Sequence, residues 1–466
     1  MVRFTRPSIV SHSCVSRWYS SQLGPSAQNL LTLAIETSCD DTSVALLEST
    51  IGNPLSPAAR LHFHERITAD NRQYGGIHPI VSLASHESSL GPLVKKALES
   101  LPSCIGVEKA PEDGRSCSSS SSSRRIPDLI AVTRGPGMRS SISIGLELAK
   151  GLAAAWDVPL IGVNHMQAHA LTPRLVSALN NPSSRSRDPA FPFLSLLVSG
   201  GHTMLVHSKS LVHHEILATT CDIAIGDCLD KIARIILPKE YLKTEGHTMY
   251  GKLLEQFAFP NPQEYNYTPP ATRAEEISEK SNRWGWSLHP PFSNTGASKA
   301  DTFSFSGLES SIQRYFTKTQ HEICLDERHD LAAKIMLIAF EHLASRVVYA
   351  LQARQPTFPQ NSNPTPLTTL VIAGGVASNH YLKTILRSFL DIRGFSNIKL
   401  SFPPPSLCCD NAAMIAWAGL EMFEQGWESD LGCRALRKWS VDPGEGDGGV
   451  LGVGGWVRRK KGRSGE

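Results

Sequence analysis

The sequence predicts an α/β fold made of two related halves that face each other across a cleft. Residues 31–46 and 193–206 have the same build: a buried-strand run, a small polar or glycine turn, and a second strand. Both segments are therefore predicted hairpins. Residues 369–379 repeat the run and the turn but continue as a helical pattern over residues 380–390. Alternating helix and strand patterns follow each hairpin, so we expect one half to repeat the other.

The turns of these segments are candidates for phosphate binding. Backbone N–H groups in such turns can point at phosphate, because glycine permits close approach and a following helix N-terminus adds a favourable dipole. A single Gly-Gly turn, such as Gly200-Gly201 or Gly374-Gly375, also fits an ordinary tight turn. The phosphate interpretation therefore depends on the repetition of the pattern.

Length and composition limit the class of protein. A chain of 466 residues is too long for one core and predicts two domains with extensions. The hydrophobic content of 41% is typical of a soluble globular protein. No apolar run approaches the length that crosses a bilayer, which argues against an integral membrane protein.

The N-terminus differs in composition from the rest of the chain. Arg3, Arg6 and Arg17 stand among serines, and no acidic residue precedes Glu36. This pattern is typical of a mitochondrial transit peptide, and a disordered basic tail is the alternative. We predict a transit peptide over residues 1–30 and a location in the mitochondrial matrix. The ten cysteines include no C-x-x-C pair, so neither a zinc ribbon nor a disulfide framework is indicated.

The net charge of +3 is concentrated at the two ends. The first thirty residues carry three bases and no acid, and residues 457–466 carry five bases and one acid. The remaining core is therefore net negative. Such a core lacks the broad basic surface of a general nucleic-acid-binding protein, so a nucleic-acid partner needs a local patch or the basic tail.

Polar and low-complexity stretches divide the chain. A serine-rich run at 116–123 predicts a surface loop, and the polar connector at 180–188 predicts the boundary between the halves. Residues 260–300 and 355–366 are further polar interruptions, the first interpreted as an insertion. We thus predict an N-terminal half over residues 31–180, a C-terminal half over residues 189–441, and a disordered, Gly-rich basic tail over residues 442–466.

Two histidines open the helix predicted after the strand at 159–164. His165 and His169 are one turn apart on one helix face and could share a metal ion. Alternatively, they are two partly exposed helix histidines. Metalloprotease helices place Glu directly after the first His, but this chain has Met166 there, which excludes that class. Asp410 precedes an apolar helix and is the best candidate for a third ligand, although Asp at this position also suits a helix N-cap.

Eight motifs occur in a fixed order between about Leu31 and Trp439. The motifs are ETSCDDT (36–42), TRGPGM (133–138), NHMQAH (164–169), VSGGHT (198–203), GDCLDK (226–231), FSFSG (303–307), GGVASN (374–379) and DNAA (410–413). Together they resemble the TsaD family of tRNA threonylcarbamoyladenosine transferases, and the N-terminal leader resembles that of a mitochondrial member.

The resemblance implies an actin-like (RNase H-like) fold with a nucleotide-binding cleft. It implies transfer of a threonylcarbamoyl group from L-threonylcarbamoyl-AMP to the exocyclic amine of the adenosine 3′ of the anticodon, in tRNAs that read codons starting with A. One metal ion, iron or zinc, would be bound by His165, His169 and Asp410. The residues implied for the adenylate are Leu197, Val198, Ser199, Gly200 and Gly201 on its phosphate side, and Asp230, Gly246 and Asn379 at its ribose and base.

Asp40 and Asp41 lie on the first predicted hairpin turn and face the cleft. One of them could orient or deprotonate the attacking amine, and the alternative is that both only form the turn. The resemblance also implies a homodimer that works without a larger accessory complex, and a separate enzyme that makes threonylcarbamoyl-AMP.

Two other functions are compatible with the phosphate turns. An ATP-dependent small-molecule kinase or hydrolase could share the fold. However, such enzymes use magnesium, which prefers carboxylates to imidazoles. A catalytically silent scaffold is the third possibility, but a scaffold has no need of the three candidate metal ligands.

Overall fold

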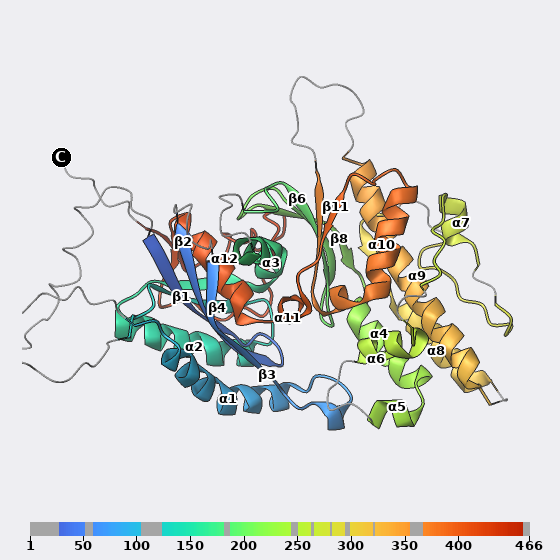
Figure 1. Cartoon of the computed structure of the whole chain (residues 1–466), viewed down its shortest axis with the longest axis horizontal. Coiled ribbons are helices and arrows are strands. Elements are labelled where there is room, and N and C mark those ends of the chain that lie inside the picture. Colours follow the sequence, from blue (N-terminus) through green and yellow to red (C-terminus); the bar gives the residue numbers. More distant parts are fainter. Residues whose placement is uncertain are drawn as a thin grey trace, which may run out of the picture.

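The computed structural model of the chain contains two β-sheets with helices on both sides of each (Figure 1). It describes residues 28–51, 59–103, 124–180, 187–243, 250–261, 265–279, 282–293, 299–319, 322–354 and 367–459. Most of the predicted transit peptide, the serine-rich run, most of the 180–188 connector and the whole 355–366 interruption lie outside these ranges.

The first sheet has seven strands in the order β13-β12-β5-β4-β1-β2-β3. The predicted first hairpin is confirmed, because β1 and β2 pair antiparallel around the turn at 37–40. β4 and β5 then add in parallel to the other side of β1. The strands are β1 (Gln28–Glu36), β2 (Asp41–Ile51), β3 (Ala59–Thr68), β4 (Leu129–Gly135), β5 (Leu160–Asn164), β12 (Trp427–Ser429) and β13 (Trp456–Arg458).

The second sheet has six strands in the order β11-β10-β6-β7-β8-β9. β6 and β7 form the predicted second hairpin, and β10 and β11 add in parallel beside β6. The strands are β6 (Phe193–Val198), β7 (Thr203–Ser208), β8 (His214–Thr220), β9 (Thr302–Phe303), β10 (Thr369–Ala373) and β11 (Lys399–Ser401).

The two sheets share one topology. The first contains β3-β2-β1-β4-β5 and the second contains β8-β7-β6-β10-β11, with three antiparallel strands followed by two parallel ones in each. Because parallel strands need a crossover, helices cover both sheet faces. The prediction of an α/β fold with two related halves is therefore confirmed.

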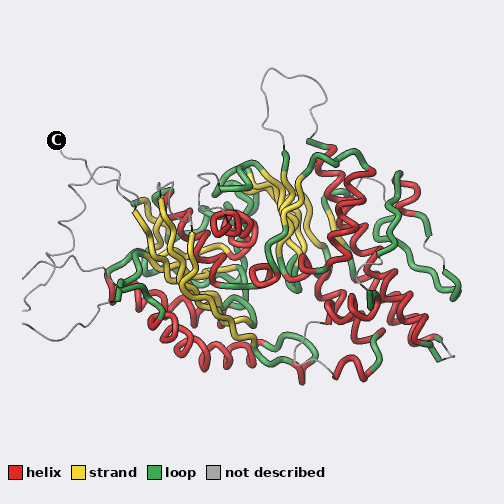
Figure 2. The backbone as a smooth tube through the Cα atoms, in the orientation of Figure 1, coloured by secondary structure: helices red, strands yellow, loops and turns green. Residues whose placement is uncertain are grey.

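Helices α3 and α12 lie between the two sheets, while α1 and α2 cover the outer face of the first sheet (Figures 1 and 2). Helices α4, α6, α8, α9 and α10 share an apolar core with the second sheet (Figure 1). None of the helices in the described ranges combines the length and the apolar character needed to span a bilayer. The helices are α1 (Pro79–Glu99), α2 (Arg139–Trp156), α3 (His165–Asn180), α4 (Ile225–Ile236), α5 (Lys239–Lys243), α6 (Tyr250–Ala258), α7 (Arg273–Ile277), α8 (Ser306–Lys318), α9 (Leu325–Gln352), α10 (His380–Ile392), α11 (Pro405–Cys408) and α12 (Ala412–Glu424), with short 3-10 turns η1 (Arg72–Tyr74) and η3 (Gly375–Ser378).

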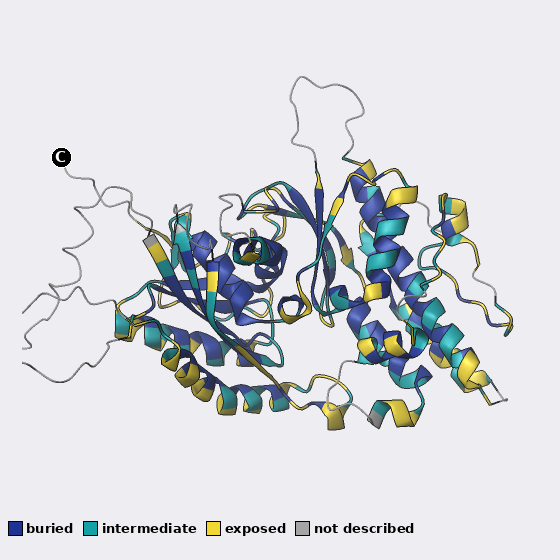
Figure 3. Ribbon diagram, in the orientation of Figure 1, coloured by how far each residue is buried: buried dark blue, intermediate teal, exposed yellow. Residues whose placement is uncertain are grey.

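One apolar core joins the halves. It contains Met166 of α3 and Met414 of α12, together with Ala34 of β1, Leu197 of β6 and Ala373 of β10. α3 is buried on nearly all sides, as expected for a helix between two sheets (Figure 3). Burial of apolar surface from both halves against the same two helices fixes the halves relative to each other. The site described below depends on this arrangement.

The predicted boundaries of the C-terminal part were wrong. α12, β12 and β13 follow the second half in sequence but pack on the first: α12 covers β1, β2 and β4, and β12 pairs with β5. The predicted disordered tail is ordered as far as residue 459, because β13 pairs antiparallel with β12. Residues 460–466 of the predicted tail lie outside the described ranges.

Candidate metal centre and the facing turns

The start of α3 sets the position of the two histidines. Asn164 ends β5, and its Oδ1 accepts the N–H groups of Met166 and Gln167 at 3.0 and 3.1 Å, which caps the helix. His165 and His169 then lie one turn apart on the same face, and both are buried. The alternative of two partly exposed helix histidines is thus excluded.

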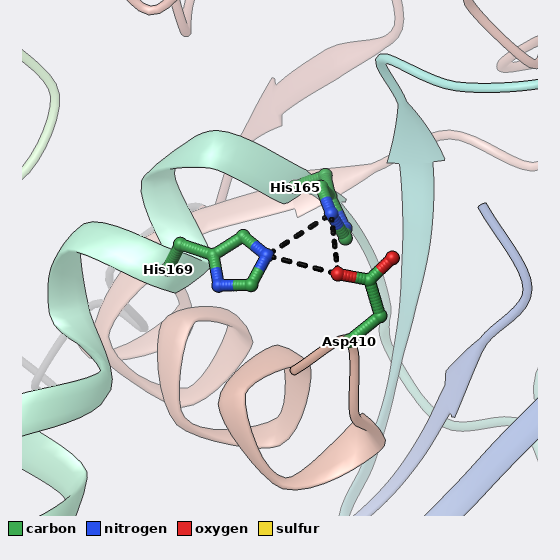
Figure 4. Close-up of side chains that lie close together, drawn as sticks. All are labelled: His165, His169 and Asp410. Carbon is green, nitrogen blue, oxygen red and sulfur yellow. Dashed lines mark hydrogen bonds and ion pairs between the residues drawn. The ribbon is translucent and has the colours of Figure 1, made fainter. Parts of the chain in front are cut away.

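Asp410 is far from both histidines in sequence but lies next to them in the structure (Figure 4). Its Oδ1 lies 3.1 Å from His169 Nε2 and 3.3 Å from His165 Nε2, and the two Nε2 atoms are 3.2 Å apart. The alternative role of Asp410 as an N-cap is wrong. Asn411 caps α12 by accepting Met414 N–H at 3.0 Å, and this leaves Asp410 to face the histidines.

Glu36 and Ser38 support His165 from behind. Glu36 Oε2 lies 3.1 Å from His165 Nδ1, and Ser38 Oγ lies 3.3 Å from the same atom. Thr133 Oγ1 also donates to Glu36 Oε2. A carboxylate on Nδ1 fixes the ring so that Nε2 faces the site. Glu36 stands in the first sequence motif but had no predicted role. Its position at the end of a buried strand was the one indication in the sequence that this carboxylate has a buried partner.

The three ligand atoms fit a metal ion. Metal–nitrogen and metal–oxygen bonds of about 2.1 Å place neighbouring ligands about 3.0 to 3.4 Å apart, depending on the bond angle. The observed separations of 3.1, 3.2 and 3.3 Å fall in this range. Glu36 supplies the outer carboxylate that metal-binding histidines usually have. His165, His169 and Asp410 can therefore bind one metal and leave further coordination positions for other ligands.

Charge in the centre makes a proton and a metal ion compete for His165. Burial would lower the pKa of His165, but the carboxylates of Asp410 and Glu36 outweigh burial and raise it well above its ordinary value. Burial likewise opposes ionisation of Asp410, yet His165 and His169 hold its pKa well below the ordinary range. The carboxylate is thus ionised, and a metal must displace the proton that His165 holds.

The first hairpin turn ends at Asp40, and Asp41 begins β2, where it pairs with Thr68 of β3. Both carboxylates lie in the electric field of the metal centre. Burial raises the pKa of Asp41 to about 7, and the negative charge of Asp410 adds to this rise. The positive charge of Arg66, whose Nη1 lies 3.5 Å from Asp41 Oδ2, acts in the opposite direction. Burial and the charge of Asp410 also raise the pKa of Asp40. A carboxyl group with a pKa of about 7, as at Asp41, can accept a proton during a reaction.

The second hairpin turn approaches the same centre. Burial and the proximity of His165 lower the pKa of His202 to about 4, so its imidazole is neutral. Ser199 Oγ accepts His202 N–H at 3.0 Å and closes the turn, while Gly200 and Gly201 lie exposed with open space where a Cβ would stand. Leu197 and Val198, the other predicted residues, are buried in β6. Sequence reasoning assigned no role to His202.

Asp230 and Asn379, two of the three residues predicted for ribose and base, have structural partners in the second half. Asp230 accepts Gly251 N–H at 2.7 Å, and burial raises the pKa of this carboxyl to about 6. Asn379 caps α10 by accepting Leu382 N–H at 2.9 Å. Gly246 lies outside the described residues. The third predicted turn contacts the second, because Gly374 packs against the backbone of Val198.

Comparison with known proteins shows the family of the chain. The family model described as "TsaD: tRNA N6-adenosine threonylcarbamoyltransferase" matches residues 116–417. The chain therefore belongs to the TsaD family. It is 35% identical over 452 residues to the mitochondrial tRNA N6-adenosine threonylcarbamoyltransferase of Schizosaccharomyces pombe, covering 95% of this chain and 93% of the relative. It is also 32% identical over 413 residues to the Zymomonas mobilis tRNA N6-adenosine threonylcarbamoyltransferase, covering 89% and 92%.

Membership of the TsaD family identifies the chain as a metal-dependent transferase of tRNA modification, with tRNA as a substrate. Among solved structures, HypF of T. kodakarensis aligns over 86% of this chain and 48% of its own, at 15% identity and a TM-score of 0.44.

Replacing Glu36 with glutamine is expected to weaken metal binding by about 10- to 100-fold, because the neutral amide no longer polarises the His165 ring. Metal affinity is measured by competition with a chelator of known affinity. Glu48→Gln is the matched control, since Glu48 Oε2 lies 2.8 Å from His62 Nε2 in a carboxylate–histidine pair on β2 and β3. Equal metal affinities for the two variants would contradict the supporting role of Glu36.

Replacing Gly374 with alanine is expected to lower the free energy of unfolding by about 3 kcal/mol or more and to displace the second hairpin turn. Gly374 has φ +101°, and an added Cβ would overlap the carbonyl of Val198. Gly394→Ala separates the two causes, because Gly394 has φ +84° with open space around it and should cost only about 1 kcal/mol. Denaturant unfolding measures both. Equal losses would mean that contact with Val198 is unimportant.

Proposed function

We propose that the chain transfers the threonylcarbamoyl group of L-threonylcarbamoyl-AMP to the exocyclic amine of the adenosine 3′ of the anticodon, in mitochondrial tRNAs that read codons starting with A. The main support is the convergence of the three ligands, the Asp40-Asp41 turn and the His202 turn on one site between the two halves. Transfer of an acyl group from a mixed anhydride of a nucleotide needs a binding place for the phosphate, an electrophilic group for the carbonyl oxygen, and a proton acceptor.

For the metal we propose one ion of iron or zinc held by His165, His169 and Asp410. When bound, this ion supplies Lewis-acid polarisation of carbonyl or phosphate oxygens. Two imidazoles and one carboxylate form a ligand set that suits these metals better than magnesium, which prefers oxygen ligands.

The protein residues carry the remaining steps. Leu197, Val198, Ser199, Gly200 and Gly201 are proposed to hold the phosphate side of the adenylate, and Asp230, Gly246 and Asn379 its ribose and base. The amine nitrogen forms a bond to the carbamoyl carbon, the bond from that carbon to the phosphate oxygen breaks, and AMP leaves. The nitrogen loses one proton, which Asp40 or Asp41 is proposed to accept.

The setting follows from the N-terminal composition and from the relatives. We propose that residues 1–30 direct the chain to the mitochondrial matrix, as the name of the S. pombe relative suggests. There it would act as a homodimer, supplied with threonylcarbamoyl-AMP by a separate synthase.

The test is modification of tRNA by the purified chain. Unmodified tRNA is incubated with the chain, a threonylcarbamoyl-AMP-generating enzyme, threonine, bicarbonate and ATP, and its nucleosides are analysed by mass spectrometry. We expect threonylcarbamoyladenosine to form, and none when the adenosine 3′ of the anticodon is replaced by guanosine. Absence of product from the folded, metal-loaded chain would reject the proposal, and ATP consumption without tRNA would point to a kinase or hydrolase.

A further inference from the structure

A short basic segment near the C-terminus lies outside the functions assigned so far. Residues 433–440 contain Arg434, Arg437 and Lys438 and no acid, and all three of these side chains are exposed. Arg139, at the start of α2, is exposed as well. Among the described residues, none of the four forms an ion pair with a carboxylate. We call these four residues the basic rim.

Backbone hydrogen bonds fix the basic rim beside the metal centre. Leu436 N–H donates to the carbonyl of Arg134 at 2.8 Å, and Gly137 N–H donates to the carbonyl of Arg437 at 3.2 Å. The segment is held again after Lys438, because Asn164 Nδ2 donates to the carbonyl of Trp439 at 3.2 Å. Asn164 directly precedes His165, the first metal ligand.

The Gly-Pro-Gly turn at 135–137 connects the basic rim to the first hairpin. Met138 N–H donates to the carbonyl of Ser38 at 2.8 Å, and Ser38 Oγ contacts His165. A Cβ at Gly135 would overlap the carbonyl of Leu436, so glycine is what allows the basic segment to approach so closely. The rim is thus held by fixed backbone close to the metal ligands rather than on a free tail.

We propose that the basic rim binds the phosphodiester backbone of the tRNA whose adenosine enters the site. This inference rests on the proposed function. A macromolecular substrate needs contacts outside the reaction centre, and unpaired exposed Arg and Lys side chains provide them to phosphate. Because the core is net negative, a nucleic-acid partner needs a local patch of this kind or the basic tail. The tail bases Arg458 and Arg459 are less suitable, since their guanidinium groups lie over the Trp427 and Phe423 rings.

The test compares two double charge reversals in the full chain. Arg437→Glu/Lys438→Glu reverses the rim, and Arg314→Glu/Lys318→Glu makes the same change in net charge on exposed positions of α8 in the second half. Binding of unmodified tRNA is measured by fluorescence anisotropy at several salt concentrations. We expect the rim variant to raise the Kd at least about tenfold and to reduce the salt dependence by about one to two released ions, with the control within about twofold of wild type.

Steady-state kinetics, metal content and thermal unfolding are measured for the same variants. The rim variant should raise KM for tRNA while KM for threonylcarbamoyl-AMP, metal content and Tm stay at wild-type values, and Arg139→Glu should act in the same direction. Equal Kd values for the rim variant and the control would overturn the proposal. If the wild-type chain binds tRNA through the rim but modifies none, the proposed function fails while this inference stands.

Discussion

His169→Ala is expected to abolish stoichiometric metal binding and to lower the rate of tRNA modification by about 10³-fold or more. His169 Nε2 is one of three atoms that lie 3.1 to 3.3 Å from one another, and no other His, Cys, Asp or Glu among the described residues joins this cluster. Removing the imidazole leaves two protein ligands, too few to hold the ion in place. Metal content is measured by elemental analysis, and product by mass spectrometry of the nucleosides.

His213→Ala is the control for this experiment, and Asp410→Asn tests a second ligand. His213 is exposed on the loop before β8, so its removal should leave both metal and rate within about twofold of wild type. Asp410→Asn keeps the shape of the side chain but removes the charge, so it should lose metal as His169→Ala does while retaining the fold. Full metal content and activity in His169→Ala would show that the ligand assignment is wrong.

The site was predictable where its chemistry is local in sequence. His165 and His169 are separated by one helical turn, and this spacing alone places them on one face. The hairpins were predictable because a buried run, a turn and a second run are contiguous. Asp410 could be proposed as the third ligand, but its distance from the histidines was not predictable, since it depends on α12 packing against the first half.

The C-terminal segment shows what local patterns miss. Its glycines predicted disorder, yet residues 442–455 are ordered. Side-chain hydrogen bonds hold them, some to residues far away in the sequence. Asp442 accepts Ile216 N–H at 2.7 Å, and Asp447 accepts Ser440 N–H at 2.6 Å. The indole of Trp456 donates to the carbonyl of Val450 at 2.9 Å. Composition does not specify such pairings, because each needs a backbone position that only the folded chain supplies.

Glu36 was missed for a related reason. It ends β1 within an apolar run, and its sequence neighbours give no sign of the His165 ring that lies 3.1 Å away. The strand pattern predicts burial but not the partner of a buried carboxylate. Since an unpaired buried charge is costly, a buried Glu at a strand end implies some partner, and that inference was available from the sequence.

Asp41→Asn is expected to lower kcat for tRNA modification by about 10²- to 10⁴-fold while metal content stays at the wild-type level. Burial, opposed by Arg66 and assisted by Asp410, raises the pKa of Asp41 to about 7. Below that pH the carboxyl is protonated and cannot accept the proton that the amine loses. The wild-type rate should therefore rise with pH up to about 7 and then level off. A bound cation lowers the pKa, so the midpoint is expected at or below pH 7.

The pH profile distinguishes a proton acceptor from a residue that only shapes the turn. Asp41→Asn should give a flat profile at its low rate, because the titrating group is gone. Asp70→Asn is the matched control: Asp70 lies just after β3, is exposed, and pairs with Arg72 at 2.5 Å, so rate and profile should match wild type. Asp40→Asn assigns the roles within the turn. If Asp40→Asn flattens the profile and Asp41→Asn keeps it, Asp40 accepts the proton and Asp41 orients the amine.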